Sequence, residues 1–278
     1  MSAPLRIATA LLAGTALCAG CAGAGSAAPA PTPVSTAASG LAATTVAGAG
    51  PPPPAPAPAA TRAAAPVVLL DPGHNGGNGG ATTAINRKVP DGRGGTKACN
   101  TTGTSTDAGY AEHDFTWDLA QRVRAQLQAA GVTVVLTRPD DGGVGPCVDE
   151  RGEAGAKSGA AAAVSLHADG AAAKARGFHI AYSDPPLNAA QSGPARTLAT
   201  DLRDALQGGR FAPADYIGAQ GLDGRDDLGG LNTAAVPTAL VECANMRNPA
   251  EAELVSSPAG RDRYAKAITA GILAFLGR

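Results

Sequence analysis

An abrupt change in composition near Pro66 determines which part of this chain can fold. Residues 1–65 are mostly Ala, Pro, Gly, Ser and Thr, and they include no acidic residue. A segment of this kind has too few large apolar side chains to offset the conformational entropy that is lost on folding. We therefore expect one folded domain in residues 66–278, whose length of about 210 residues is typical of a single domain.

The residues before this domain have the pattern of an exported protein. Arg6 precedes an apolar run that is too short to span a membrane, which is typical of a secretory signal peptide in residues 1–28. The run ends near CAGC, which is similar to a lipoprotein cleavage box with Cys18 in place of the usual leucine, so lipidation of Cys21 and ordinary cleavage are both open. We predict a disordered Ala/Pro-rich linker in residues 29–65 and a location in the periplasm, in the cell wall or outside the cell.

Charge argues against nucleic acid as a partner. Residues 66–278 contain 20 basic and 23 acidic residues, a net charge of −3, because Arg6 and Arg62 are the only charged residues before them. Domains that bind nucleic acid usually carry a clear excess of Lys and Arg. We therefore expect no nucleic-acid partner. We also expect no transmembrane span, because the apolar run after Arg6 is too short for one, and we expect a monomer.

Apolar runs alternate with amphipathic stretches through the expected domain. In FTWDLAQRVRAQLQAA, Leu119, Val123 and Leu127 recur every four residues on one helix face, and Gly131 ends the helix. Strands that alternate with helices indicate an α/β fold, a single layered domain with a central, largely parallel or mixed sheet flanked by helices. We predict strands at 67–70, 132–137, 160–166, 177–182 and 237–242, and helices at 115–130, 150–157, 189–206 and 258–276.

Three ionisable side chains lie at the ends of predicted strands. His74 follows the strand that ends at Leu70, His167 directly follows AAAAVSL, and Glu242 ends PTALVE. One such histidine alone could simply cap a strand end. Ligands of open α/β sheets bind beyond the carboxyl ends of the strands, so three ionisable groups at these positions predict a common site.

Two imidazoles and one carboxylate are a common ligand set for a catalytic zinc ion, with a fourth position left for water. Glu112 is the preferred carboxylate because it lies in the first turn of the long predicted helix, where the helix dipole favours an anion. His113 is the alternative, but consecutive helical residues point about 100° apart, so the two side chains can hardly bind the same ion. We predict one Zn²⁺ per domain, bound by His74, Glu112 and His167.

Glu242 is the candidate catalytic residue. It closes a strand whose preceding residues are apolar or small. It could pair with Arg247 or a backbone amide, or it could act as a general base and acid for an attacking water molecule. Because two candidate metal ligands share its surroundings, we predict the catalytic role.

Other residues give weaker signals. Cys99 and Cys147 lie in polar loops and could form a disulfide that ties the 75–111 insertion, long enough to cover the metal site, to the loop before Asp149. We expect Cys243 to be a buried thiol. Asp71 could orient His74, or it could simply start the turn before Pro72. We expect Arg151 and His179 to be structural, with lining of the cleft as the alternative for His179. The 221–232 loop is either a surface loop or a cleft wall supplying Arg225, Asp227, Leu228 and Leu231.

Several blocks together resemble the zinc-dependent N-acetylmuramoyl-L-alanine amidases of the amidase 3 type, in the exported single-domain form of mycobacteria and related actinobacteria. The blocks are DPGHNGG, Glu112 before the amphipathic helix, DERGEAGAKSGAAAAVSLHADG, and VPTALVECANMRNPAEAELVSS. They occur in the family's order and cover essentially all of 66–278. Asp169 and Cys243 depart from the residues that are usual at their positions, but neither change removes a candidate ligand.

The resemblance implies hydrolysis of the amide between the lactyl group of N-acetylmuramic acid and L-alanine, in peptidoglycan or muropeptides, for cell-wall remodelling or recycling. It also implies that His74, Glu112 and His167 hold the zinc ion and that Glu242 is the catalytic carboxylate. Two other functions are open. One is a zinc carboxypeptidase or endopeptidase acting within the stem peptide, and the other is a catalytically silent protein that binds muropeptides.

Overall fold

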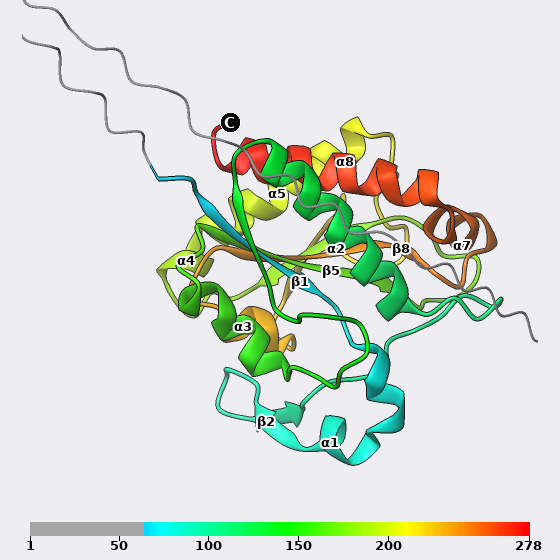
Figure 1. Ribbon diagram of the computed structural model, residues 1–278, viewed down its shortest axis with the longest axis horizontal. Helices are drawn as coiled ribbons and strands as arrows, with labels where there is room; N and C mark the ends of the chain where they lie inside the picture. Colours follow the sequence, from blue (N-terminus) through cyan, green and yellow to red (C-terminus); the bar gives the residue numbers. More distant parts are fainter. Residues whose placement is uncertain (1–63) are drawn as a thin grey trace, which may run out of the picture. The chain divides into compact units, whose positions relative to one another are not determined.

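The computed structural model describes residues 64–278, and a six-stranded sheet forms the centre of this part (Figure 1). Its order is β4-β1-β5-β8-β6-β7, and every neighbouring pair is parallel except β8 and β6. The α/β fold with a largely parallel sheet is therefore confirmed. The strands are β1 Val67–Pro72, β4 Thr133–Leu136, β5 Ala162–Asp169, β6 His179–Ser183, β7 Leu222–Arg225 and β8 Thr238–Asn245.

Helices cover the two faces of the sheet unequally. The long helices α2, α5 and α8 pack together on one face, whereas the shorter α3 and α6 contact each other on the opposite face (Figure 1). None of the helices in residues 64–278 combines the length and the hydropathy that a membrane span requires. The helices are α1 Thr82–Asn86, α2 Glu112–Ala129, α3 Val148–Lys157, α4 Ala189–Ser192, α5 Pro194–Gly208, α6 Gly229–Asn232, α7 Pro249–Ser256 and α8 Pro258–Phe275, with a 3₁₀ helix at Gly76–Gly80.

The two faces of the sheet carry different side chains because successive residues of a strand point to opposite sides. On β5, Val164 and Leu166 pack into the main apolar core with the long helices. Ala163, the residue before Val164, packs with Leu69 in a small cluster on the other face, where α3 lies. By the same alternation, His167 projects from the face that the short helices only partly cover.

The 75–111 insertion contains ordered structure of its own. It includes α1 and a two-stranded hairpin of β2 Lys88–Pro90 and β3 Thr96–Ala98. A disulfide joins Cys99 to Cys147, as predicted, and so ties the end of the hairpin to the start of α3. Cys243 is a buried free thiol in the main core, also as predicted.

Some predicted boundaries are wrong. The helix predicted at 189–206 is two helices, because the chain turns at Gly193 and the proline at 194 starts the second helix. Strands β5 and β8 each run three residues beyond their predicted ends, so His167 lies within a strand rather than after it, and Glu242 lies inside its strand rather than at the end. The predictions for residues 1–28, and for all but the last two residues of 29–65, concern residues outside the described part.

Candidate active site

A cavity of about 530 Å³ lies on the sheet face that carries α3 and α6, near the carboxyl ends of β1 and β5. Its volume is within the range of small-molecule sites. His74, Glu112, His167 and Glu242 all line it. Glu242 faces His167 directly across the parallel β5–β8 pair, so both side chains project from the same face. The four residues that the sequence predicted for one site are therefore brought together.

Glu112 lies between the two histidines. Its Oε2 is 3.0 Å from Nε2 of His74, and its Oε1 is 2.9 Å from Nδ1 of His167. One ligand atom from each of the three residues lies within 4.8 Å of the other two. The imidazole rings are nearly perpendicular, with centroids 4.9 Å apart. Two nitrogens and a carboxylate that converge in this way form a donor set suited to Zn²⁺.

His74 is oriented by contacts on the side of its ring away from Glu112. Its Nδ1 lies 3.2 Å from both the backbone carbonyl oxygen and the hydroxyl oxygen of Thr101. Its other ring nitrogen, Nε2, therefore points toward Glu112 and the other ligand atoms, and a proton on Nδ1 would leave Nε2 a lone pair for a metal ion. His74 itself has a positive φ of 59°, which is uncommon for any residue other than glycine. The sharp DPGH turn thus sets the direction of this side chain.

Two glycines make room for the three residues. A Cβ atom at Gly73 would lie 2.3 Å from the His167 ring, and one at Gly103 would lie 2.8 Å from both Glu112 Oε2 and His74 Cδ2. Gly103 also has a positive φ of 79°. Side chains at these two positions would displace the histidines and the carboxylate, so both glycines support the site.

The pKa values of the two glutamates shift in opposite directions. Burial raises the pKa of Glu112, but the charge of His74 and hydrogen bonds from both histidines outweigh it, so the pKa lies below its usual range. Burial also raises the pKa of Glu242, and the negative charges of Glu112 and Asp169 raise it further. One carboxyl group is thus held ionised among the histidines, while its neighbour has a high proton affinity.

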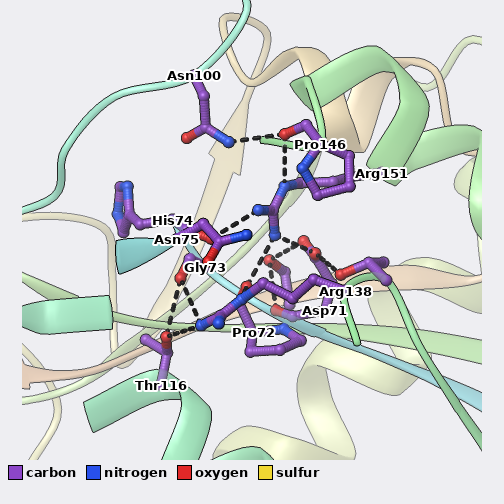
Figure 2. A network of polar contacts seen from close by, with 12 residues as sticks. Asp71, Pro72, Gly73, His74, Asn75, Asn100, Thr116, Arg138, Pro146 and Arg151 are labelled. Atoms are coloured by element: carbon purple, nitrogen blue, oxygen red, sulfur yellow. Dashed lines mark hydrogen bonds and ion pairs between the residues drawn. The ribbon is translucent and has the colours of Figure 1, made fainter. Parts of the chain in front are cut away.

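Two buried arginines hold the turn that carries His74 (Figure 2). Arg151 donates to the Pro72 and His74 carbonyl oxygens at 2.7 Å and pairs with the Asp71 carboxylate at 2.6 Å. Arg138 donates to the Pro72 carbonyl oxygen at 3.0 Å. The turn ends a strand, so these carbonyl groups lack strand partners, and the guanidinium groups satisfy them. The predicted structural role of Arg151 is confirmed.

The predicted contact of Asp71 with His74 is wrong. The Asp71 carboxylate accepts hydrogen bonds from Thr137 at 2.6 Å, from Ser165 at 2.7 Å and from Arg151 at 2.6 Å. Burial raises its pKa, but Arg151 and the two hydroxyl groups lower it by more. Asp71 therefore supports His74 only indirectly, by fixing Arg151.

We expect Arg151→Met to destabilise the domain by about 3–5 kcal/mol at pH 7, because it leaves the buried Asp71 carboxylate without its counter-charge. Chemical denaturation measures the change. In the wild type the depressed pKa of Asp71 adds stability that is lost as pH falls; in the variant the unpaired carboxyl has a raised pKa, so the difference between the proteins should shrink toward pH 4.

Arg176→Met is the matched control for this prediction. Arg176 is exposed and lies 3.9 Å from Asp215, which is exposed as well, so its removal should change stability by less than about 1 kcal/mol. Equal effects of the two substitutions at pH 7, or a difference that grows as pH falls, would contradict the structural role of Arg151.

The geometry does not support His113 as the third ligand or Arg247 as the partner of Glu242. His113 turns away from the three convergent residues and lies 2.8 Å from Asp141. Arg247 pairs with Asp107 at 3.1 Å, whereas Oε2 of Glu242 is buried with no hydrogen-bond partner within residues 64–278. Glu112 and an unpaired Glu242 are therefore the residues that face the cavity.

The 221–232 segment forms part of the cavity wall, which supports the second of its two predicted roles. Leu228 and Leu231 line the cavity, whereas Arg225 and Asp227 pair with each other. Sequence reasoning missed Thr101, whose carbonyl orients His74, and Thr104, whose backbone N–H donates to Glu112 at 2.9 Å. Both lie in a Gly- and Thr-rich stretch without periodicity, so no sequence signal could have identified them.

Comparisons with known proteins agree with this geometry. Residues 68–274 match the family Amidase_3, described as N-acetylmuramoyl-L-alanine amidase. The N-acetylmuramoyl-L-alanine amidase Rv3717 of Mycobacterium tuberculosis is 52% identical over 213 residues, which are 77% of this chain and 87% of that protein.

Solved structures show the same fold. The N-acetylmuramyl-L-alanine amidase Ami1 of Mycobacterium smegmatis has a TM-score of 0.75 and 53% identity, over 77% of this chain and 98% of that one. AmiC2 of Nostoc punctiforme, also named an N-acetylmuramoyl-L-alanine amidase, has a TM-score of 0.57 and 25% identity, over 77% of this chain and 98% of that one. With a family match across nearly the whole described domain, this chain belongs to the N-acetylmuramoyl-L-alanine amidase family Amidase_3.

Proposed function

We propose that this protein hydrolyses the amide bond between N-acetylmuramic acid and L-alanine in peptidoglycan or muropeptides. The observation that carries the proposal is the convergence of His74, Glu112 and His167 beside Glu242 in one cavity, in a chain of this family. The name of the 52% identical relative supports the substrate. A role in cell-wall remodelling or recycling follows from this substrate.

The three convergent residues are proposed to hold one Zn²⁺. The donor set favours this ion, because two neutral imidazoles and one carboxylate leave a fourth position open, as in zinc hydrolases. The backbone N–H groups of Thr104 and Ala168 donate to Glu112 at 2.9 and 3.2 Å and fix its carboxylate. A bound zinc ion would supply Lewis-acid polarisation of the scissile carbonyl group and would make water more acidic.

Glu242 is proposed as the general base and acid. Its carboxylate takes a proton from the attacking water as the C–O bond forms, and it returns that proton to the departing amine nitrogen as the C–N bond breaks. The strands fix its place, because its backbone is paired with β5 on one side and β6 on the other. Its high proton affinity, which follows from burial and from Glu112, suits a group that must hold a proton between the two steps.

The experiment is product analysis on a defined muropeptide with the purified protein. Only cleavage at the proposed bond gives an N-acetylmuramic acid with a free lactyl carboxylate and a stem peptide with a free L-alanine amine. Mass spectrometry distinguishes these products from the shortened stem peptides that a carboxypeptidase or endopeptidase would release. Binding of zinc and muropeptide without any product would instead identify a silent binding protein.

Residues 66–278 are proposed to be the catalytic domain, exported by a signal peptide in residues 1–28 and separated from it by the 29–65 linker. The composition of these segments supports the proposal, as does a disulfide within the described part, since disulfides are typical of oxidising compartments. We further propose that the protein acts at the cell wall, either free or anchored through Cys21.

A further inference from the structure

His179 is the residue directly opposite Glu242 on the neighbouring strand. The two are paired in register across the antiparallel β6–β8 pair. Residues paired in this way project from the same face, with Cβ atoms about 4.5–5.5 Å apart. His179 is only 3% exposed and does not line the cavity. It therefore lies behind Glu242, on the side away from the space where a substrate would bind.

Each of these two side chains has a buried polar atom without a partner. Within the described part of the chain, Nδ1 of His179 and Oε2 of Glu242 are both buried and make no hydrogen bond. An unsatisfied buried polar atom is costly, and neighbouring pairs of such atoms are uncommon in native proteins. Because the two residues are paired on one face of the sheet, the two atoms are candidates to satisfy each other, directly after a rotation of the Glu242 side chain or through one bridging water.

The other side of the His179 ring faces Asp223 and Tyr216. Its Nε2 lies 3.8 Å from Oδ2 of Asp223 on β7, and Asp223 pairs with Arg225 at 3.2 Å. The ring of Tyr216 meets the His179 ring edge-to-face, with centroids 6.1 Å apart. The Nε2–Asp223 distance is too long for a hydrogen bond, so the ring proton is available to Nδ1. Burial lowers the pKa of His179, although Asp223 and Asp169 raise it, which favours a neutral ring with a single proton.

We propose that His179 positions the catalytic carboxylate, by donating a hydrogen bond from Nδ1–H to Oε2 of Glu242. This bond fixes one oxygen of Glu242 and leaves Oε1 directed to the cavity, where it can receive the proton of the attacking water. A donor at this oxygen favours the ionised form that a base needs, and so opposes the effect of burial on the carboxylate. The inference rests on the proposed role of Glu242, and it assigns to His179 more than the structural role that its sequence context predicts.

Three substitutions separate hydrogen bonding from packing. His179→Leu keeps about the same volume without a donor, His179→Asn keeps a donor near the place of Nδ1, and His179→Ala keeps neither. We expect the Leu and Ala variants to lose about 10- to 100-fold in kcat with little change in KM, and the Asn variant to recover most of the loss. In a Glu242→Gln background, His179→Leu should cost nothing further.

A packing role gives the opposite order, in which Leu retains activity and Asn does not, and this order would overturn the proposal.

Nitrogen-15 NMR of the imidazoles gives a second test that needs no activity. The chain has four histidines, so single substitutions assign every signal. We expect the proton of His179 on Nδ1, and a proton found on Nε2 instead would also overturn the proposal.

A wild-type protein that releases no lactyl carboxylate would refute the proposed function, whereas an active wild type with an equally active His179→Leu variant would refute this inference alone.

Discussion

His167→Ala is expected to remove tightly bound zinc and to abolish release of the free lactyl carboxylate. The imidazole of His167 is one of three side chains whose ligand atoms converge, and two ligands hold Zn²⁺ much more weakly than three. The measurement is the zinc content of protein purified in zinc-containing buffer and then dialysed, together with the rate of product formation. We expect about one zinc per wild-type chain and much less than one in the variant.

His113→Ala is the matched control. His113 is the neighbour of Glu112 in sequence, and with Asp114 and Asp141 it forms a second group of possible ligands, more open to solvent. We expect this variant to keep its zinc and its activity. If His113→Ala lost its zinc and His167→Ala kept it, the second group would be the metal site, and the proposed centre would be refuted.

Removal of the metal from the wild type tests the same point without a substitution. A strong chelator should stop product formation, and added Zn²⁺ should restore it, whereas Mg²⁺ should not, because two nitrogen donors suit zinc better than magnesium. Circular dichroism should change little on chelation. The sheet and its apolar core do not depend on the three ligands, since His74, Glu112 and His167 lie at the edge of the cavity rather than in the core.

The site residues were predictable because each follows or closes an apolar run at the carboxyl end of a strand. Along β8, Ala239, Val241 and Cys243 belong to the main core, whereas Leu240 and Glu242 point to the opposite face and line the cavity. An ionisable residue in such a run cannot be an ordinary core residue, so it stands out in the sequence. His167 stands out on β5 for the same reason.

The supporting contacts could not be predicted, because they depend on segments far apart in the chain. Arg151 reaches the turn at His74 across 77 residues, and the sequence around Arg151 fits an ordinary helix start. Asp71 precedes a proline, which suggests a turn starter, but its partners are Thr137 just after β4, Ser165 on β5 and Arg151 on α3. Such pairings are decided by strand order, which alternation along the sequence does not reveal.

His179 illustrates the same limit. Its place between Phe178 and Ile180 suggested a structural residue on a strand, and the structure confirms both the strand and the burial. What the sequence could not show is that β6 runs antiparallel to β8 in the register that places this ring opposite Glu242. Its suggested role depends on that register, which the sequence does not show.

Glu242→Gln is expected to lower kcat by about 10²- to 10⁴-fold, the usual contribution of a general base and acid, because an amide cannot take the proton of the attacking water. Zinc content and affinity for muropeptide should stay close to those of the wild type, since Glu242 is not among the three convergent ligands. Rates are measured by quantifying the free lactyl product, and binding is measured by calorimetry. Glu253→Gln, on the exposed side of α7, is the control and should keep full activity.

The stability of the same variant gives an independent check on the environment of Glu242. Burial and the charge of Glu112 raise the pKa of Glu242, so its ionised form is disfavoured in the folded protein. A carboxyl with a raised folded pKa contributes stability that is lost as pH rises, whereas glutamine has no charge to bury. We therefore expect zinc-free Glu242→Gln to melt at a higher temperature than the zinc-free wild type at pH 8, with a smaller difference at pH 4. A variant that loses activity and also melts lower at pH 8 would indicate a structural role for Glu242, and the assignment of the catalytic base would then be wrong.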